Sequence, residues 1–382
     1  MTMKGDLLIL GGTMVDPARD FYGKSDVVVR NGKIMEWPSG ETVEAEKVIN
    51  AEGCLVLPGL IDHHAHAFPA GTDIGIYPDS THLPQGVTTV VDQGSAGVNN
   101  CESFFNSIVG NSQTRIFAYL NVSPAGLSAL PRALEPVDPK TYELESARSL
   151  FEKYDKRLLG LKVRQSKEIV GELGLVPLAA TVQMANALGC KVTVHTTNSP
   201  GNVNELTALL RPGDIFTHMY QGQGNTILDD KRRVRKAVRD ARSRGILFET
   251  ADGRAHFTFS VAQSAISDGF EPDLISTDLV KASQFDRPAF GLPLMMSKYL
   301  CLGIPLQRVV KACTSTPARL IGMEGKIGTL SPGAYADIAI FQLKEMTILL
   351  RDIFDQELAC NQILIPRLTV LKGRVVYRSL DF

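Results

Sequence analysis

Eight short apolar runs alternate with amphipathic segments between about residues 57 and 325, and this alternation limits the fold more than any other feature. The first run is GLIDHHAH (59–66), the last is DLISTD (273–278), and helical patterns such as VPLAATVQMANALG (176–189) lie between them. A strand followed by a helix, repeated along a chain, predicts a parallel sheet. Eight such units predict a (β/α)8 TIM barrel within the α/β class. A doubly wound open sheet is the alternative, but no GxGxxG follows the first run.

Both ends of the chain show a different pattern, in which apolar and polar residues alternate. DLLILGGTMVDP (6–17) and SDVVVRNGKIMEW (25–37) contain Gly-Gly and Asn-Gly turns, as hairpins do. GAYADIAIFQL (333–343) and RLTVLKGRVVYR (367–378) repeat the pattern near the C-terminus. We therefore predict a small β-sandwich domain formed by residues 1–56 and 326–382. The barrel, residues 57–325, would be inserted between its two parts.

The overall charge gives no reason to expect nucleic acid or an anionic membrane as a partner. The chain has 40 Lys and Arg against 41 Asp and Glu, a net charge of -1. One basic segment, DDKRRVRKAVRDARSRG (229–245), has apolar residues at helical spacing, which indicates the exposed face of an outer helix. We expect a small-molecule substrate as the partner, and the sequence leaves a homo-oligomer open.

Cysteine spacing and hydropathy predict the cellular compartment. The six cysteines form no CxxC pair, which in a chain of this length indicates reduced thiols. No stretch approaches the roughly 18 apolar residues of a membrane span. The N-terminal apolar run is too short for the core of a signal peptide. We therefore expect a cytoplasmic protein.

Three of the seven histidines lie in the first apolar run, at positions 63, 64 and 66. Residues two apart in a strand point the same way, so His64 and His66 share one face, with Cα atoms about 6.6 Å apart. That spacing lets both rings bind one metal ion. His63 points the other way on this alternation, which favours packing or a hydrogen bond. The pair lies at the carboxyl end of the strand, where barrels of this kind place their active sites.

Further polar residues occur at the same end of other predicted strands. Lys162 lies near the end of the fourth, His195 and His218 end the fifth and sixth, and Asp278 ends the eighth. A single buried histidine on a strand is usually a core residue with a hydrogen-bond partner. Four such groups at one rim of a barrel, beside an HxH pair, indicate a metal site instead.

Several segments together resemble a known family. PGLIDHHAH, His195, His218, Asp278 and the closing GTLSPGAYADIAIF are similar to the amidohydrolase superfamily of metal-dependent hydrolases, over essentially the whole chain. GVTTVVDQGSAG (86–97), GLKVRQS (160–166) and GLPLMMSKYLCLGIPL (291–306) narrow the resemblance to its amidohydrolase/deacetylase, or dihydroorotase-like, group. The resemblance implies two zinc ions bridged by a carboxylated lysine. On that implication one zinc takes His64, His66 and Asp278, the other takes His195 and His218, and Lys162 is the bridge.

The implied chemistry is hydrolysis of an amide or an ester. Two zinc ions would hold a bridging hydroxide, since a metal lowers the pKa of water to about 7. This hydroxide would attack a carbonyl polarised by one zinc. Asp278 would accept the proton and pass it to the leaving group, as general acid–base catalysis requires.

The predicted substrate residues follow from strand alternation and from departures from the family pattern. Dihydroorotases typically follow HxH with an arginine, whereas this chain has AFPAGTDIG after His66, so dihydroorotase activity itself is not favoured. Arg164 shares a face with Lys162 and either binds a substrate carboxylate or forms an internal ion pair. Tyr220 is related to His218 in the same way and could hydrogen-bond the substrate.

One departure from the family lies after the seventh strand. Deacetylases often have Gly-His-Gly there, whereas this chain has ADGRAHF (251–257), with Asp252 in the place of the histidine and Arg254 and His256 nearby. Asp252, Arg254 and Gly291, the first residue of the GLPLMM segment, complete the predicted substrate contacts. We predict a hydrolase for a small acylated amino or hydroxy acid. The alternatives are a cyclic amide hydrolase of the dihydroorotase or hydantoinase type, a lactonase, and a non-catalytic barrel scaffold.

Overall fold

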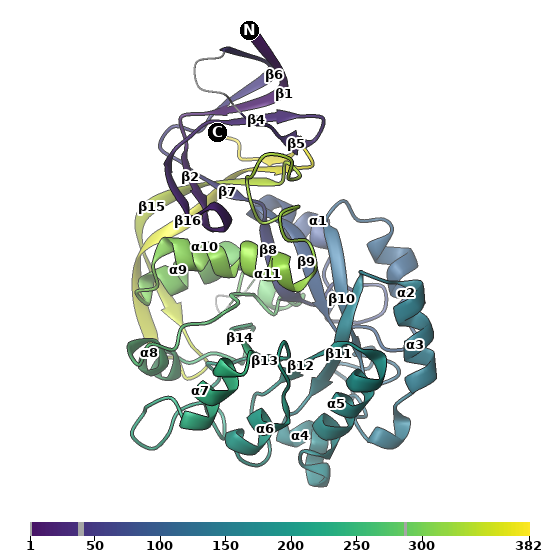
Figure 1. Cartoon of the computed structure of the whole chain (residues 1–382). Helices are drawn as coiled ribbons and strands as arrows, with labels where there is room; N and C mark the ends of the chain where they lie inside the picture. The colour runs from purple at the N-terminus through teal and green to yellow at the C-terminus, as the bar shows by residue number, and fades with distance from the viewer. Residues whose placement is uncertain (1, 37–41, 286–288) are drawn as a thin grey trace.

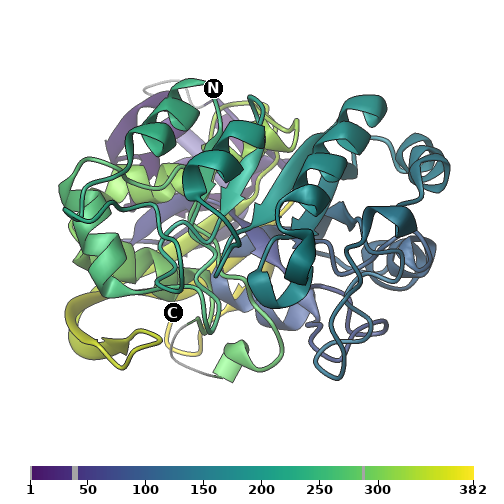
Figure 2. The same cartoon turned by 90° about the horizontal axis from the view of Figure 1, so that it is seen from below.

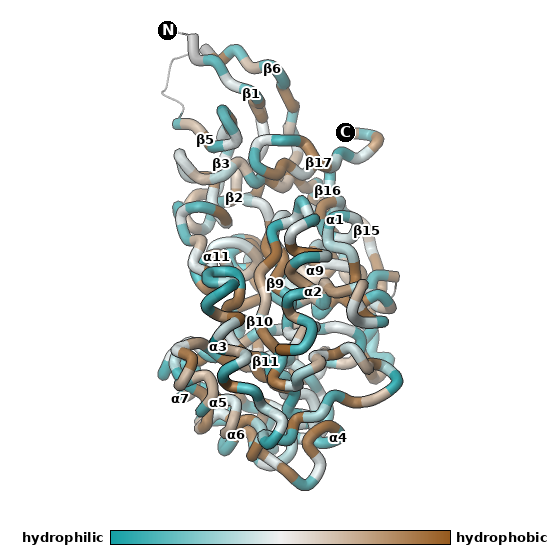
Figure 3. Tube along the Cα trace, turned by 90° about the vertical axis from the view of Figure 1, so that its right-hand side faces the viewer, coloured by the Kyte–Doolittle hydropathy of each residue, from teal (hydrophilic) through white to brown (hydrophobic). Residues whose placement is uncertain are grey.

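Seven of the predicted strands form one parallel sheet. The computed structural model describes residues 2–36, 42–285 and 289–382 (Figure 1). The strand order is sequential from β8 to β14. The strands are β8 (Leu60–Ala65), β9 (Val87–Gln93), β10 (Arg115–Asn121), β11 (Leu158–Arg164), β12 (Lys191–His195), β13 (Ile215–Thr217) and β14 (Leu247–Glu249). Every residue of β8, β9 and β10 is buried, because a parallel sheet is covered on both faces. Figure 3 shows the resulting apolar character along β9 and β10.

The eighth predicted strand, 273–278, is an irregular segment that closes the barrel. Leu274 forms a parallel bridge with Glu249 of β14, and Leu279 forms one with Ala65 of β8, so both edges of the sheet meet at this segment. Asp278 between these bridges has a φ of 52°, outside the strand region. The α/β barrel is therefore closed by two short bridges on either side of the residue predicted to be catalytic.

Helices follow the strands and surround the sheet (Figure 2). The α-helices are α1 (Pro78–Thr81), α2 (Cys101–Phe104), α3 (Leu144–Lys153), α4 (Lys167–Val170), α5 (Val176–Leu188), α6 (Val203–Leu209), α7 (Lys236–Ser243), α8 (Phe259–Ser267), α9 (Leu292–Cys301), α10 (Leu306–Ala312) and α11 (Ser315–Leu320). The other helical segments are the π-helix η3 (Phe105–Val109) and the 3-10 helices η1 (Pro17–Arg19), η2 (Leu83–Gln85), η4 (Pro139–Thr141), η5 (Gly171–Leu173) and η6 (Ser283–Phe285). Of the basic segment 229–245, only α7 is helical. It buries Val238 and Ala241, Lys236 and Asp240 are exposed, and Arg242 lies over the Phe270 ring, 3.6 Å from its centroid.

Strands from both ends of the chain pair with one another. One sheet has the order β17-β16-β15-β7-β2-β3, and it joins β2 (Thr13–Asp16), β3 (Phe21–Lys24) and β7 (Leu55–Pro58) to β15 (Ile338–Arg351), β16 (Glu357–Leu371) and β17 (Arg374–Arg378). A second sheet, β5-β4-β1-β6, contains β1 (Thr2–Leu10), β4 (Val27–Arg30), β5 (Lys33–Ile34) and β6 (Thr42–Asn50). Val29, Val56 and Leu368 share one apolar core between the sheets. The sandwich description and the boundaries at residues 56 and 326 stay predictions, and Trp37 lies outside the described residues.

The prediction that all cysteines are reduced is wrong for one pair. Cys301 at the end of α9 and Cys360 on β16 form a disulfide, whereas Cys54, Cys101, Cys190 and Cys313 are free. The two partners are 59 residues apart in the sequence and meet only because the β15–β16 hairpin packs along α9. The cysteines therefore no longer support a cytoplasmic location, which stays a prediction.

None of the described helices is by itself long and apolar enough to cross a membrane. One pair of helical segments, Lys167–Leu173 and Val176–Leu188, passes by length and composition but is bent by 89°.

Candidate metal centre

The carboxyl ends of the barrel strands bring the predicted metal ligands together. His64 lies on β8 and His66 directly after it, Lys162 lies on β11, and His195 ends β12. His218 follows β13 immediately, and Asp278 belongs to the closing segment. A cavity of about 160 Å³ is lined by five of these six side chains, His64, His66, Lys162, His195 and Asp278. His218 lies beside them, with its ring centroid 4.3 Å from that of His195.

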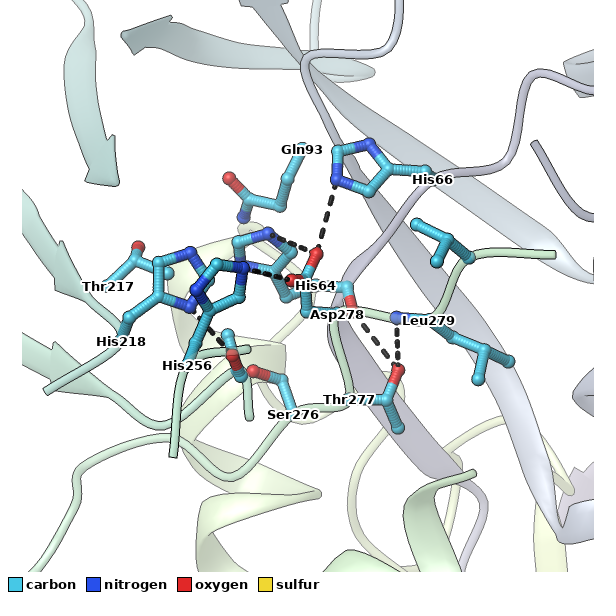
Figure 4. Close-up of polar contacts among 12 residues, drawn as sticks. His64, His66, Gln93, Thr217, His218, His256, Ser276, Thr277, Asp278 and Leu279 are labelled. Atoms are coloured by element: carbon cyan, nitrogen blue, oxygen red, sulfur yellow. Dashed lines mark hydrogen bonds and ion pairs between the residues drawn. The ribbon is translucent and has the colours of Figure 1, made fainter. Parts of the chain in front are cut away.

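Two overlapping groups have their ligand atoms within metal-binding reach. The ligand atoms of His64, His218 and Asp278 all lie within 4.8 Å of one another, and the same holds for His195, His218 and His256. Asp278 Oδ1 is 3.2 Å from His66 Nε2 and 3.4 Å from His64 Nε2. Figure 4 shows the rings of His64, His66 and His256 turned toward the Asp278 carboxylate. Imidazole nitrogens and a carboxylate are the usual ligands of zinc, so this donor set fits a divalent metal.

The histidines are oriented by hydrogen bonds on their other ring nitrogens. His64 Nδ1 lies 3.0 Å from Glu249 Oε2, and His218 Nδ1 lies 2.7 Å from the Ala251 carbonyl oxygen. A carbonyl or carboxylate oxygen only accepts, so Nδ1 donates and the Nε2 lone pair is left for a metal. His66 Nδ1 lies 3.0 Å from Ser95 Oγ, a hydroxyl that can accept a hydrogen bond from it as well as donate one. His218 Nε2 is buried with no partner among the described residues, as expected of a ligand atom.

Burial sets the protonation of two of these histidines. It lowers the pKa values of His195 and His218 well below the ordinary value, so both rings are neutral. Around His64 the balance differs, because Glu249 and Asp278 outweigh the effects of burial and Lys162 and raise its pKa. Neutral rings beside buried carboxylates offer lone pairs and negative charge, which is the environment that a cation requires.

Glu249 is a functional residue that the sequence analysis missed. It ends β14, is fully buried, and holds two histidines, with Oε1 2.9 Å from His63 Nδ1 and Oε2 3.0 Å from His64 Nδ1. Burial alone would raise the pKa of Glu249, but His63 and His64 bring it well below the usual range. An ionised second carboxylate therefore fixes the ring of a metal ligand. The signal in the sequence was the glutamate in the seventh apolar run, ILFET (246–250).

His63 forms a hydrogen bond, as predicted, but strand alternation predicted the wrong direction for its ring. Its ring reaches the same Glu249 carboxylate as His64, rather than the opposite face of the strand. The register between β8 and β9 shifts between Asp62 and Ala65, which accounts for the departure. His63 therefore acts on the predicted metal ligands through Glu249.

Lys162 is buried and lacks a hydrogen-bonding partner among the described residues. Burial lowers the pKa of its ammonium group to about 8, so the amine loses its proton far more easily than an exposed lysine. Gly94 leaves the space for this side chain, because a Cβ there would lie 2.7 Å from Lys162 Cβ. Gly94 also has a φ of 79°, which favours glycine. A buried amine at the cavity wall that gives up its proton this easily fits the predicted bridging role.

Asp278 is held in an unusual backbone conformation and stays ionised. Its N–H donates to the His64 carbonyl oxygen at 2.8 Å, which ties the closing segment to β8. Burial would raise the pKa of Asp278, but His64, His66 and His256 hold it well below the usual value. The carboxylate can therefore serve as a ligand and accept a proton.

Of the five predicted substrate residues, Arg164 and Arg254 line the cavity. Arg164 Nη1 is 3.0 Å from Glu135 Oε2. Arg164 therefore forms the internal ion pair that was its alternative role, and it also faces the cavity. Arg254 is exposed at the rim. Two guanidinium groups at one opening favour a substrate with a carboxylate.

The geometry does not support substrate contacts at the other three positions. Tyr220 is fully buried, and its hydroxyl donates to the Phe270 carbonyl oxygen at 2.9 Å. The alternation that placed it beside His218 fails, because His218 has a φ of 64° and the strand has ended. Asp252 is buried away from the cavity in an ion pair with Lys298. Gly291 precedes α9, and a Cβ there would overlap the side chain of Gln85, so glycine is needed for packing.

Comparisons with known proteins agree with this geometry. Residues 302–377 match the family described as "Amidohydrolase family". A protein named deacetylase from Agrobacterium fabrum is 34% identical over 332 residues, covering 87% of this chain and 81% of that protein. A solved structure of a dihydroorotase is 31% identical with a TM-score of 0.89, covering 98% of this chain and 99% of that one. A solved structure of an adenine deaminase is 27% identical with a TM-score of 0.89, covering 98% and 100%.

The chain therefore belongs to the amidohydrolase superfamily and is a hydrolase acting on carbon–nitrogen bonds. The resemblance predicted from PGLIDHHAH and the strand-end histidines is confirmed at this level. The scaffold alternative required lost ligands, whereas the structure brings all six predicted positions together.

Proposed function

We propose that the protein is a binuclear zinc amidohydrolase of the deacetylase type. Its substrate would be a small acylated amino or hydroxy acid, cleaved at the amide or ester bond. The observation that carries this proposal is the cluster of neutral histidines, ionised Asp278 and unpartnered Lys162 around one small cavity. The deacetylase name of a relative 34% identical to the chain supports the acyl group as the part removed.

The residues of the cluster divide between two metal positions. His64, His66 and Asp278 would hold one Zn2+, and His195 and His218 would hold the other. Lys162 would bridge them as a carbamate: its ammonium would lose one proton, and the resulting amine would add to CO2 and release a second proton, so that an unpartnered cation becomes an anion. When bound, a divalent ion acts as a Lewis acid on a carbonyl oxygen and lowers the pKa of a water molecule to about 7.

The side chains around the metals would bind the substrate and move the proton. Asp278 accepts the proton of the attacking water at one carboxylate oxygen and donates it to the leaving nitrogen or oxygen. Arg164 and Arg254 orient the substrate carboxylate at the opening. Leu127, Leu130 and Val280 add apolar surface to the cavity wall, which suits a short acyl group.

Hydrolysis of a cyclic amide is the second candidate. The observation in its favour is the dihydroorotase structure with a TM-score of 0.89. The same cluster would open a ring by the same proton transfer, and Arg164 could bind the carboxylate of such a ring. Because AFPAGTDIG provides no arginine after His66, we rank this candidate below the deacetylase.

The first step of the test is metal content. Protein purified without chelator should contain more than one equivalent of divalent metal per chain, measured by elemental analysis. The second step is a hydrolysis screen of the zinc-loaded enzyme against N-acyl amino acids, O-acyl hydroxy acids, cyclic amides and lactones. Turnover of the acyl acids is expected. Consistently less than about half an equivalent of metal after reconstitution would remove the basis of the proposal.

A further inference from the structure

We propose that His256 is a further metal ligand, completing a three-histidine site with His195 and His218. The proposal rests on the metal centre described above and adds a ligand from the loop after β14. The ligand atoms of these three histidines lie within 4.8 Å of one another. The ring centroid of His256 is 4.2 Å from that of His218 and 4.9 Å from that of His195. Figure 4 shows His256 beside His218, on the same side of the Asp278 carboxylate.

The hydrogen bonding of His256 follows that of the other ligands. His256 Nδ1 lies 2.8 Å from Thr197 Oγ1, just as His66 Nδ1 contacts Ser95 Oγ. With Nδ1 engaged by the hydroxyl, Nε2 faces the interior, 3.4 Å from Asp278 Oδ2. Histidine ligands in proteins commonly have their second nitrogen fixed by such a partner. The ring is thus oriented for a metal before one binds.

The loop that carries His256 is anchored at its base. The carboxylate of Asp252 is buried, pairs with the ammonium of Lys298 on α9, and accepts a hydrogen bond from the Tyr299 hydroxyl at 2.8 Å. The His256 N–H in turn donates to the Asp252 carbonyl oxygen at 3.1 Å. Asp252 therefore positions the loop, although it does not reach the cavity.

Gly253 allows the loop to approach the metal centre. Its φ is 50°, and a Cβ there would lie 2.5 Å from Asp278 Oδ2 and 3.1 Å from His256 Cδ2. Any other residue would push the loop away from Asp278. The close approach and the anchored base bring His256 to the centre at little cost in loop entropy when a metal binds.

The alternative role for His256 is a hydrogen bond to Asp278 without ligation. The two roles predict different spectra for the cobalt-substituted protein. A fifth histidine ligand adds a fifth exchangeable, paramagnetically shifted imidazole N–H signal to those of His64, His66, His195 and His218. A hydrogen-bonding His256 would leave four. This measurement uses the wild-type protein and so does not depend on the folding of any variant.

The variant test is His256→Ala, with metal affinity measured by chelator competition. We expect a loss of about 100-fold or more for one of the two ions, and an altered visible spectrum of the cobalt protein that added imidazole restores. Thr197→Val should weaken the same ion less, since removing an outer partner of a ligand costs about 10- to 100-fold. The matched control is His82→Ala, because His82 is a buried histidine that bonds Asp62 rather than the cluster.

Four shifted signals in the wild type, or unchanged affinity and spectrum in His256→Ala, would overturn the proposal. A wild-type protein that binds no metal would instead overturn the proposed function. The metal content of the wild type thus tests the proposed function, and the comparison with His256→Ala tests ligation by His256.

Discussion

Lys162→Ala is expected to abolish hydrolysis and to lose at least one equivalent of metal. Lys162 is the one predicted bridge between the two metal positions, and its Nζ has no partner among the described residues that would explain its burial otherwise. Turnover and metal content of the variant, measured after the same reconstitution as the wild type, check the expectation. Short carboxylic acids added to the variant should partly restore both, because they can occupy the place of the carbamate.

The stability of the metal-free protein gives an independent measure of Lys162. Burial lowers its pKa from 10.5 to about 8, so below pH 8 the folded state bears the full cost of burying a charged amine. Lys162→Met should therefore raise the free energy of unfolding, by about 3 kcal/mol at most. The gain should decline as the pH rises from 8 to 10.5, because the wild-type lysine becomes neutral in both states. Chemical denaturation of both proteins, in CO2-free buffer that contains a chelator, measures this difference in the free energy of unfolding.

Lys298 provides the matched control for this effect. It is also buried, but it forms an ion pair with the buried Asp252. Lys298→Met leaves that carboxylate without its partner, so it should destabilise the protein where Lys162→Met stabilises it. Full metal and full turnover in Lys162→Ala, or equal signs for the two methionine variants, would show that Lys162 has a structural role.

Residues on regular strands could be placed from the sequence. His64, Lys162 and His195 lie on strands of a parallel barrel, where the carboxyl ends must meet at one rim. Hydrophobic periodicity was therefore enough to predict that these residues lie together, because their meeting at one rim depends only on the order and direction of the strands. The α/β class follows from the same signal.

Residues beyond the strand ends could not be placed in this way. His218, Ala251 and Asp278 all have positive φ angles, which redirect the chain just where the strands stop. Strand alternation therefore failed for Tyr220, which points into the core. Backbone conformations of this kind are set by tertiary contacts and are common at functional sites.

Contacts between residues distant in the sequence were the other feature of the site that could not be predicted. Glu249 holds His64 from a strand at the opposite edge of the sheet, 185 residues away. The Asp252–Lys298 pair likewise joins the loop after β14 to α9. Neither pairing leaves a local pattern, because each depends on closure of the barrel and not on the spacing within one element.

Asp278→Asn is expected to keep most of its metal and to lose at least about 100-fold in turnover. Asparagine retains the shape and one ligand oxygen but cannot accept a proton. His64, His66 and His256 keep the pKa of Asp278 well below its usual value, so the wild-type carboxylate is ionised throughout the working pH range. A rate decline between about pH 5 and 7 would thus come from another group and persist in the variant. Metal analysis and pH–rate profiles of both enzymes measure this.

Asp214→Asn is the control for Asp278→Asn, because it makes the same change at a buried carboxylate near the start of β13. Asp214 accepts the Val192 N–H at 2.9 Å and pairs with Arg211, at the amino-terminal end of the barrel strands, opposite the cavity. Its substitution should lower the free energy of unfolding and leave turnover per folded molecule unchanged. If Asp278→Asn instead turned over near the wild-type rate with full metal, proton transfer would have to be assigned to another group at the cavity.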